Sequence, residues 1–452
     1  MARSTRFTLI ATILGSSIAF IDMTVVNVAL PAIQRDLGGG LAAQQWIVDA
    51  YLLTLGSLIL VGGSLGDIFG EVRVFKFGVA AFGIASALCA FAPDANTLIV
   101  FRGLQGIAGA LLTPASLAVI TSTFSGAERG AAIGTWTAWS GVSTVIGPLL
   151  GGWLIDVTSW RVIFLLNVPI AIITVGIAIT LMAPLESENE RVPVDFLGAA
   201  LCVAGLGSFV FGFIEQPRRG WADPLVPATI AAGVACLIAF VLWEKRHPNP
   251  MLPLGLFKKR NFSVTNIETF SVYGGLSALG FFLALFLQQF CGYSPLQAGL
   301  ATLPMTIVLF AFSRYAGRGS AKFGPRVFMA AGPLIAGLST IPLARLPTHF
   351  NYWTDLFPSI LGFSIGLALT VAPLTTTVLS DAGPRDAGIA SGVNNAVARI
   401  AGLIAIAVIG LAASNGGKLT EHGFHVATAI TAVLICAGGI IGAVGLRNPR
   451  SA

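Results

Sequence analysis

The segment GSLGDIFGEVRVF, residues 63–75, joins two apolar stretches that we predict at 45–63 and 74–92. It is rich in glycine and carries three charged side chains between runs that have almost none. In both directions from this segment, long apolar stretches alternate with short charged loops, from Phe7 to Leu446. Apolar stretches of this length are typical of helices that cross a bilayer, so the pattern predicts an all-α membrane protein.

The composition argues against an ordinary soluble protein. Charged residues make up 10% of the 452 residues and apolar residues 55%, with a mean hydropathy of +0.84, whereas soluble domains carry about 25% charged residues. Each span needs about 20 apolar residues to cross roughly 30 Å of hydrocarbon, so fourteen spans use about 280 residues. The remainder suffices for short loops and leaves no room for a soluble catalytic domain.

Fourteen stretches are long and apolar enough to be spans. The stretch 244–261, after the eighth of them, is the longest and most basic loop and is predicted to lie along the membrane surface. The predicted spans lie at approximately 7–29, 45–63, 74–92, 97–121, 131–155, 161–182, 195–214, 224–243, 262–290, 296–314, 326–345, 354–379, 388–412 and 425–446.

The basic residues predict the orientation in the membrane. With both chain ends on one side, that side receives eighteen of the Lys and Arg residues and the opposite side six, while Arg102 and Arg399 fall inside spans. Positive charge collects on the cytoplasmic side, so we expect a multi-pass protein of the cell membrane with both termini cytoplasmic. The net charge of +6 therefore reflects topology, and no nucleic-acid partner is expected.

A faint internal repeat predicts the domain organisation. Residues 317–328, GRGSAKFGPRVF, align with residues 63–75 with one deletion, and each segment holds Phe-Gly before a basic residue. Duplicated helical bundles that rock about a central site are a common design of secondary carriers. We predict an N-terminal six-helix bundle at 1–185, two additional helices with a cytoplasmic linker at 186–261, and a C-terminal six-helix bundle at 262–452.

Three further motifs lie within predicted spans: DMTVVNVALP at 22–31, RGLQG at 102–106 and GPLLGG at 147–152. Together with residues 63–75, they resemble a major facilitator superfamily carrier of the fourteen-helix drug:proton antiporter branch, over essentially the whole chain. The resemblance implies the major facilitator fold, two six-helix bundles plus two extra helices. It also implies proton-coupled export of amphipathic, cationic small molecules, as in multidrug efflux, without a cofactor.

Two other functions stay open. The same scaffold suits an exporter of one specific metabolite or natural product. A membrane-embedded enzyme is the more distant alternative, because the sequence has no nucleophile motif, no phosphate-binding loop and no cluster with metal-ligand spacing. His422 and His425 stand alone in a loop, so no metal site is expected. We expect a monomeric carrier, not an enzyme, whose partners are a small-molecule substrate, the proton and the lipid bilayer.

Asp22 is the first candidate for proton coupling. A carboxylate inside a span costs about 2.5–3.5 kcal/mol on insertion scales, so its presence needs a reason. One interpretation is a protonatable group that faces a central cavity; the other is a packing carboxylate paired with Arg102. The family resemblance implies coupling roles for Asp22 and Arg102, and we include Asn27 and Gln105 as polar neighbours.

The second half of the chain carries its own polar candidates. Glu268, about two turns into a span, is interpreted either as a substrate-selecting carboxylate or as an interface residue. Arg399 follows Asn394 and Asn395, which indicates a polar helix face, and a structural ion pair is the leading interpretation for this arginine. Asp49 is interpreted as part of an extracellular rim.

Aromatic and amide side chains in two spans are candidates for a pocket that binds a greasy cation by cation–π contact. Only about a third of them are expected to contact substrate. They are Trp136, Trp139, Phe281, Phe282, Phe286, Gln288 and Gln289.

Two further sets of residues are assigned conformational roles by the resemblance. The antiporter motif permits close helix approach through small residues and bends a span at proline; it comprises Gly134, Gly147, Pro148, Gly151 and Gly152. The conformational latch joins the two bundles on the cytoplasmic side, but here Ile68, Glu71 and Val72 stand where the family usually has basic residues, which weakens the latch or shifts it to Arg129. The latch comprises Gly63, Gly66, Asp67, Gly70, Arg73 and Arg129.

Overall fold

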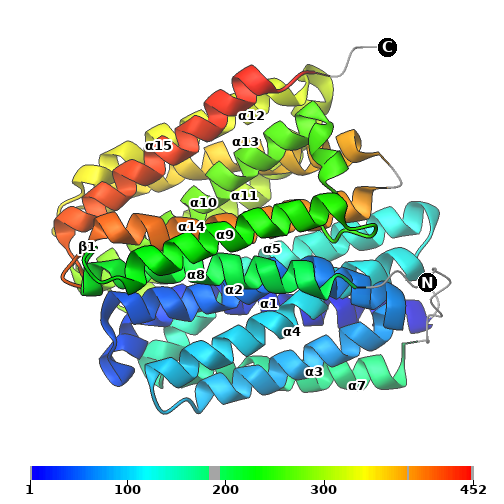
Figure 1. Cartoon of the computed structure of the whole chain (residues 1–452), viewed down its shortest axis with the longest axis horizontal. Coiled ribbons are helices and arrows are strands. Elements are labelled where there is room, and N and C mark those ends of the chain that lie inside the picture. Colours follow the sequence, from blue (N-terminus) through cyan, green and yellow to red (C-terminus); the bar gives the residue numbers. More distant parts are fainter. Residues whose placement is uncertain (1–2, 183–193, 384–385, 449–452) are drawn as a thin grey trace. The chain divides into compact units, whose positions relative to one another are not determined.

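The computed structural model describes residues 3–182, 194–383 and 386–448 (Figure 1). Nearly all of these residues are helical. The α-helices are α1 (Arg3–Leu37), α2 (Gly40–Phe69), α3 (Glu71–Ala90), α4 (Ala95–Thr123), α5 (Gly126–Val157), α6 (Arg161–Leu165), α7 (Asn167–Thr180), α8 (Phe196–Arg219), α9 (Leu225–Arg246), α10 (Arg260–Gln289), α11 (Pro295–Phe323), α12 (Pro325–Thr340), α13 (Phe357–Ala382), α14 (Ala387–Ala413) and α15 (Glu421–Gly445).

Five short elements complete the described chain. The 3₁₀ helices η1 (Leu254–Lys258) and η2 (Ile341–Arg345) and the π-helix η3 (Tyr352–Leu356) adjoin longer helices. The strands β1 (Ser414–Asn415) and β2 (Lys418–Leu419) form a hairpin whose turn glycines both have positive φ. This small hairpin is a departure from the predicted all-helical chain.

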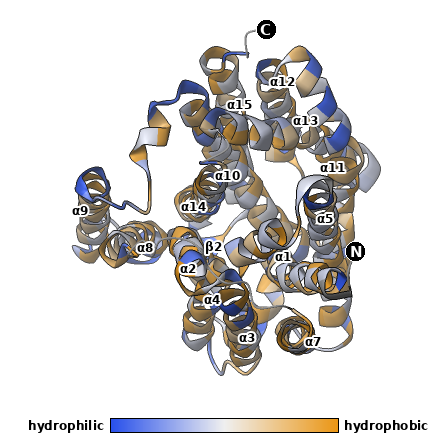
Figure 2. Ribbon diagram, turned by 90° about the vertical axis from the view of Figure 1, so that its right-hand side faces the viewer, coloured by the Kyte–Doolittle hydropathy of each residue, from blue (hydrophilic) through white to orange (hydrophobic). Residues whose placement is uncertain are grey.

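Fourteen helical segments are long and apolar enough to cross a membrane, which confirms the predicted number of spans. The sixth span consists of α6 and α7, which are interrupted at Leu166 and together run from Arg161 to Thr180. Most of the helical residues are hydrophobic by the colouring of the ribbon in Figure 2, and α7 is almost wholly apolar. Several helices extend beyond the predicted spans, as α1 shows with its 35 residues, because the ends of a helix can continue past the hydrocarbon layer.

The described chain divides into two compact units. The predicted boundary at 185/186 lies outside the described residues. Each of the two added helices is shared between the units: residues 196–207 of α8 and 235–246 of α9 belong to unit 1, and residues 208–219 and 225–234 belong to unit 2. The three-part division stays a prediction. Unit 1 comprises residues 1–207, 235–251 and 294–296, and unit 2 comprises residues 208–234, 252–293 and 297–452.

The predicted loop at 63–75 is mostly helical, which corrects that expectation. Residues 63–69 are the last turns of α2, and Gly70 alone separates α2 from α3. Gly70 has φ 90° and ψ 129°, and Gly324 has φ 84° and ψ 152° between α11 and α12. Each glycine N–H donates to the carbonyl four residues earlier at 2.9 Å. Side chains disfavour this backbone conformation, so the faint repeat is one helix–glycine–helix joint present in both units.

Polar side chains fix the ends of two helices. In unit 1, the Trp243 indole on α9 donates to both carboxylate oxygens of Asp195, at 2.9 and 3.0 Å, and so ties the start of α8 to α9. In unit 2, Arg260 Nε donates to Gly445 O and Arg326 Nε to Ala443 O, each at 2.7 Å. These two arginines satisfy the last carbonyls of α15, which have no partner within the helix.

Candidate functional site

A buried ion pair lies in unit 1 between α1 and α4. Arg102 Nη1 is 2.5 Å from Asp22 Oδ2, and the two side chains are 1% and 0% exposed. Arg102 Nε also donates to the Ile47 carbonyl at 3.1 Å, and its guanidinium lies 4.4 Å from the centre of the Tyr51 ring. Arginine keeps its charge in proteins, so the carboxylate, the carbonyl and the ring face together compensate a cation that water cannot reach.

Neutral polar groups complete this cluster. The Gln105 side chain accepts from Arg102 Nη1 at 2.6 Å and donates to Asp22 Oδ1 at 2.9 Å. Asn167, at the start of α7, donates to Asp22 Oδ1 at 3.4 Å and to Ser86 Oγ at 3.0 Å. The carboxylate therefore has two side-chain donors in addition to its charge partner, and five helices, α1, α2, α3, α4 and α7, contribute to one network.

This geometry corrects the expectation that Asp22 faces a cavity. In this conformation its carboxylate is enclosed by protein groups, and the structural pairing with Arg102 is present. Asn27 on α1 is not bonded to Asp22 or Arg102, and its Oδ1 atom is buried without a hydrogen-bond partner among the described residues. Ser86, Asn167 and Tyr51 were not predicted as site residues, because serine, asparagine and tyrosine all occur in ordinary spans and none of them carries a charge that would single it out.

Asp49 on α2 is not a rim residue, which is a second correction. It is 0% exposed, and neither carboxylate oxygen has a hydrogen-bond partner among the described residues. The sequence could have predicted this burial, because Asp49 lies about one turn inside an apolar stretch, and a carboxylate within a span indicates a functional role.

Glu268 on α10 is a carboxyl group in unit 2 that, like Asp49 in unit 1, is buried within a helix. Its side chain is 0% exposed, and both carboxylate oxygens lack a hydrogen-bond partner within the described part of the chain. It lies against α15 at Gly442, where an added Cβ would come 2.7 Å from Glu268 Oε2 and 2.7 Å from the Met329 carbonyl oxygen. A buried carboxyl group without a partner is energetically costly, so its position in a span suggests a role beyond packing.

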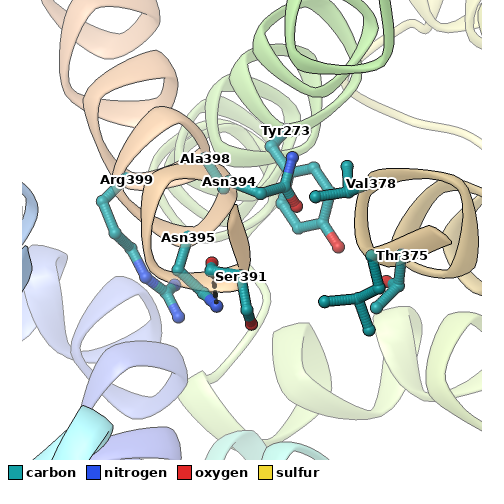
Figure 3. Close-up of a pocket in the computed structure, with 9 residues that line it drawn as sticks. Tyr273, Thr375, Val378, Ser391, Asn394, Asn395, Ala398 and Arg399 are labelled. Atoms are coloured by element: carbon teal, nitrogen blue, oxygen red, sulfur yellow. Dashed lines mark hydrogen bonds between the residues drawn. The ribbon is translucent and has the colours of Figure 1, made fainter. Parts of the chain in front are cut away.

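A polar pocket lies in unit 2 among α10, α13 and α14 (Figure 3). Its volume is about 90 Å³, and Glu268 does not line it. Asn394 Nδ2 donates to Thr269 Oγ1 at 2.7 Å and to Asn266 Oδ1 at 3.2 Å, which fixes this amide against α10. The polar residues that line the pocket are Tyr273, Thr375, Ser391, Asn394, Asn395 and Arg399.

Most of the predicted aromatic pocket is core. Phe281, Phe282 and Phe286 are at most 1% exposed, and Phe286 stacks on Phe424 with ring centres 3.9 Å apart. Trp136 donates to Ser16 Oγ at 2.9 Å, which ties α5 to α1. Trp139 is 51% exposed, so it is not part of this core. Aromatic spacing alone does not distinguish core packing from a binding pocket.

The glycines of the antiporter motif differ in their surroundings. An added Cβ at Gly147 would meet Thr24 and the Ile21 carbonyl of α1, and one at Gly151 would meet Val25. Gly152 is buried, and Pro148 lies inside α5. Gly134 has open space at its Cβ position. Close approach of α1 and α5 therefore depends on Gly147 and Gly151, whereas Gly134 plays no part in it.

The predicted latch residues are gathered around the end of α2. Asp67, Arg73 and Arg129 are exposed, and Arg129 Nε donates to the Phe124 carbonyl at 2.8 Å. Glu71 accepts from Ser122 Oγ at 2.5 Å, which joins α3 to α4. No ion pair joins these carboxylates to Arg73 or Arg129 in the parts of the chain that the structure describes.

Other residues of this segment have packing roles. Gly62, rather than Gly63, approaches the α4 backbone at Ala110, and an added Cβ at Gly66 would meet nothing. Val72 is 4% exposed, so it belongs to the buried face of α3 and is not a vacant latch position.

Fourteen membrane-capable helices and a few buried polar groups define a helical membrane carrier. A sequence profile of the Major Facilitator Superfamily matches residues 12–406. The chain belongs to this superfamily. Within the described residues, no three His, Cys, Asp or Glu side chains lie close enough together to hold a metal ion.

Relatives of known name support this assignment. The puromycin resistance protein pur8 of Streptomyces alboniger is 34% identical, covering 92% of this chain and 83% of that protein. The multidrug resistance protein Stp of Mycobacterium tuberculosis (strain ATCC 25618 / H37Rv) is 34% identical, covering 93% and 79%. The methylenomycin A resistance protein of Streptomyces coelicolor (strain ATCC BAA-471 / A3(2) / M145) is 33% identical, covering 94% and 89%.

Solved structures agree on the fold. A D-xylose–proton symporter has a TM-score of 0.69 at 14% identity, covering 98% of both chains. A structure described under substrate recognition in proton-dependent oligopeptide transporters has a TM-score of 0.69 at 16% identity, covering 97% of this chain and 98% of that one. The predicted major facilitator fold is confirmed.

Proposed function

We propose that this chain exports amphipathic small molecules, cations among them, across the cell membrane in exchange for protons. The observation that carries the proposal is the buried Asp22–Arg102 pair. A proton on Asp22 removes the negative partner of a cation that cannot itself lose its charge, so protonation and release of this pair are linked. The names of the relatives, which are resistance and multidrug resistance proteins, support export as the direction.

The energy of one proton is sufficient for such exchange. A proton that enters across 100 mV yields about 2.3 kcal/mol, which supports roughly a fifty-fold substrate gradient at about 1.4 kcal/mol per decade. In proteoliposomes with an imposed pH gradient, we expect ethidium to be moved against its own gradient. Equal movement with and without the pH gradient would contradict the proposal.

Export of one compound is the second candidate function. One relative, from Streptomyces glaucescens, is called a tetracenomycin C resistance and export protein and is 32% identical over 89% of this chain. A panel of unrelated compounds in the same vesicles separates the two functions. Transport of several structural classes favours multidrug efflux, and transport of one class favours the specific exporter.

Orientation is tested by cysteine labelling. Both Asn415 and Asn249 are exposed, and we propose that the first lies outside the cell and the second in the cytoplasm. In intact cells, a membrane-impermeant maleimide is expected to label Asn415→Cys and to spare Asn249→Cys. The reverse pattern would overturn the proposed topology.

The natural Cys291 is a source of background in that experiment. It lies between α10 and α11 and is only partly buried. Burial and the nearby Glu421 raise the pKa of its thiol to about 11, so little thiolate is present at neutral pH and its labelling is expected to be slow. Replacing Cys291 with serine in both variants removes the ambiguity.

Glu268→Gln is expected to reduce pH-driven efflux of ethidium a few-fold while transport of neutral compounds is retained. Glutamine has nearly the shape of the neutral acid, so the packing among α10, α12 and α15 is preserved and only the exchangeable proton is lost. The readout is the initial rate in proteoliposomes, with Glu421→Gln as an exposed control in the same unit. An unchanged rate for Glu268→Gln assigns this residue to packing alone.

A further inference from the structure

The sixth span has a weak point close to the buried ion pair. Its two helices α6 and α7 meet at Leu166, and Asn167 is the first residue of α7. Pro169 has no N–H group, so it cannot make the helical hydrogen bond to the Leu165 carbonyl, four residues earlier. A helix that lacks such a bond bends more easily at that place. We call residues 164–169 the α6–α7 junction.

Two side chains support this junction, and both belong to the network around Asp22. Ser86 Oγ on α3 donates to the Phe164 carbonyl at 2.8 Å. Asn167 Nδ2 donates to Ser86 Oγ at 3.0 Å and to Asp22 Oδ1 at 3.4 Å. All three side chains are 0% exposed, and α7 packs on α1 and α3 (Figure 2). The junction is therefore tied to the carboxylate by buried hydrogen bonds.

The Asn167 amide is held from one side. Its Oδ1 atom is buried without a hydrogen-bond partner among the described residues, so its position depends on the two bonds that Nδ2 donates. The Gln105 amide is fixed instead, because its Oε1 atom accepts from Arg102 Nη1 at 2.6 Å, and turning it would bring two donors together. The Ser86 hydroxyl can either donate or accept, so Asn167 can turn beside it.

Acidification changes the charge of one group in this network. Besides Asp22, its ionisable side chains in the described structure are Arg102, Cys89 and Tyr51, and no charged side chain of α5, α6 or α7 pairs with Asp22 there. The guanidinium stays positive, and a thiol or a phenol is already neutral in acid. A proton on Asp22 turns an acceptor into an O–H donor, which needs an acceptor of its own. Asn167 Oδ1 is the side-chain oxygen beside it that is not already in use.

We propose that the α6–α7 junction is a hinge that responds to the charge of Asp22, with Asn167 as the positioning residue that connects them. When Asp22 is ionised, Asn167 donates to it and to Ser86, and the junction is held. When Asp22 takes up a proton, the Asn167 amide turns and its Oδ1 accepts from the new O–H group. The Ser86 hydroxyl then turns to the same oxygen and leaves the Phe164 carbonyl, so the junction bends. The proposal rests on the proposed proton exchange for its purpose, but the response itself requires no transported substrate.

Amide hydrogen exchange of the purified full-length chain in lipid nanodiscs tests the hinge. Exchange of residues 162–172 is followed by mass spectrometry at pH 8 and pH 5, and each rate is divided by the intrinsic rate at that pH. We expect protection of the junction to be about tenfold lower at pH 5, as the loss of one hydrogen bond to a charged group provides. Residues 174–180, farther along α7, are the internal reference and should keep their protection.

Substitution of the positioning residue is expected to remove the pH response. Asn167→Leu takes away the amide, so protection of the junction should be low at both pH values. Thr174→Val is the matched control, because Thr174 is also buried on α7 but its hydroxyl donates to the Ile170 carbonyl of the same helix. This control should respond to pH as the unaltered chain does. Asp22→Asn combined with Arg102→Gln removes the titrating carboxyl without leaving an unpaired cation, and it should also lose the response.

A further variant keeps the test decisive if Asn167→Leu does not fold, as judged by thermal unfolding. Ser86→Ala removes only a hydroxyl and is expected to lower protection of the junction several-fold at pH 8. Equal protection of the unaltered chain at the two pH values would overturn the proposal, as would a full pH response in Ser86→Ala or in the Asp22/Arg102 double variant. Failure of pH-driven transport with an intact response of the junction would contradict the proposed function and leave the hinge standing.

Discussion

Asp22→Asn is expected to abolish pH-driven efflux and to destabilise unit 1. The substitution removes the proton-accepting group and also leaves Arg102 as a buried cation without a charged partner. Breaking one side of a buried pair costs about 3–5 kcal/mol. For a carboxylate without a partner, neutralisation would leave the helix at least as stable, because a lone charge within a span is destabilising. The pairing with Arg102 reverses that expectation. Rates in proteoliposomes and thermal unfolding in detergent measure the two effects.

A double variant separates the two effects. Asp22→Asn combined with Arg102→Gln removes both charges and should recover most of the lost stability but none of the coupling. Arg102→Gln alone should be less destabilising than Asp22→Asn, because a carboxylate can take up a proton whereas a guanidinium cannot give one up. Wild-type coupling in Asp22→Asn would mean that the pair is only structural.

Gly151→Leu is expected to prevent normal packing of α1 against α5 and to eliminate transport. A Cβ at this position would already meet Val25, and overpacking of a close contact costs typically about 1–3 kcal/mol. Gly134→Leu, on the same helix but with open space at its Cβ position, is the matched control and should fold normally. Yield of folded protein and the unfolding temperature are the readouts. Equal stability of the two variants would exclude a packing role for Gly151.

The number of spans could be predicted because hydropathy acts locally. Each helix must satisfy its own backbone within the bilayer, so a long apolar stretch identifies a span without knowledge of its neighbours. The end of α2 was harder to predict, because the glycine-rich stretch 63–70 resembles a loop. In the structure this stretch is helical up to Phe69. Only the backbone of Gly70 shows where the chain turns.

The candidate site was predictable only in part. Asp22 and Arg102 stand out as charges within apolar stretches, but their pairing depends on how α1 packs on α4, eighty positions away along the chain. Asn394, Asn395 and Arg399 indicated a polar helix face, whereas Tyr273 and Thr375 belong to other helices and are ordinary residues for a span. Residues that form a site only when different helices pack together cannot be recognised from any one stretch of the sequence.

Proton movement driven by substrate is the most direct test of exchange. Proteoliposomes containing the full-length chain and a pH-sensitive dye are given an ethidium gradient and no initial pH gradient. Coupled exchange predicts that protons move in the direction opposite to ethidium, and that Asp22→Asn eliminates this movement. Ethidium transport without any proton movement would contradict the account.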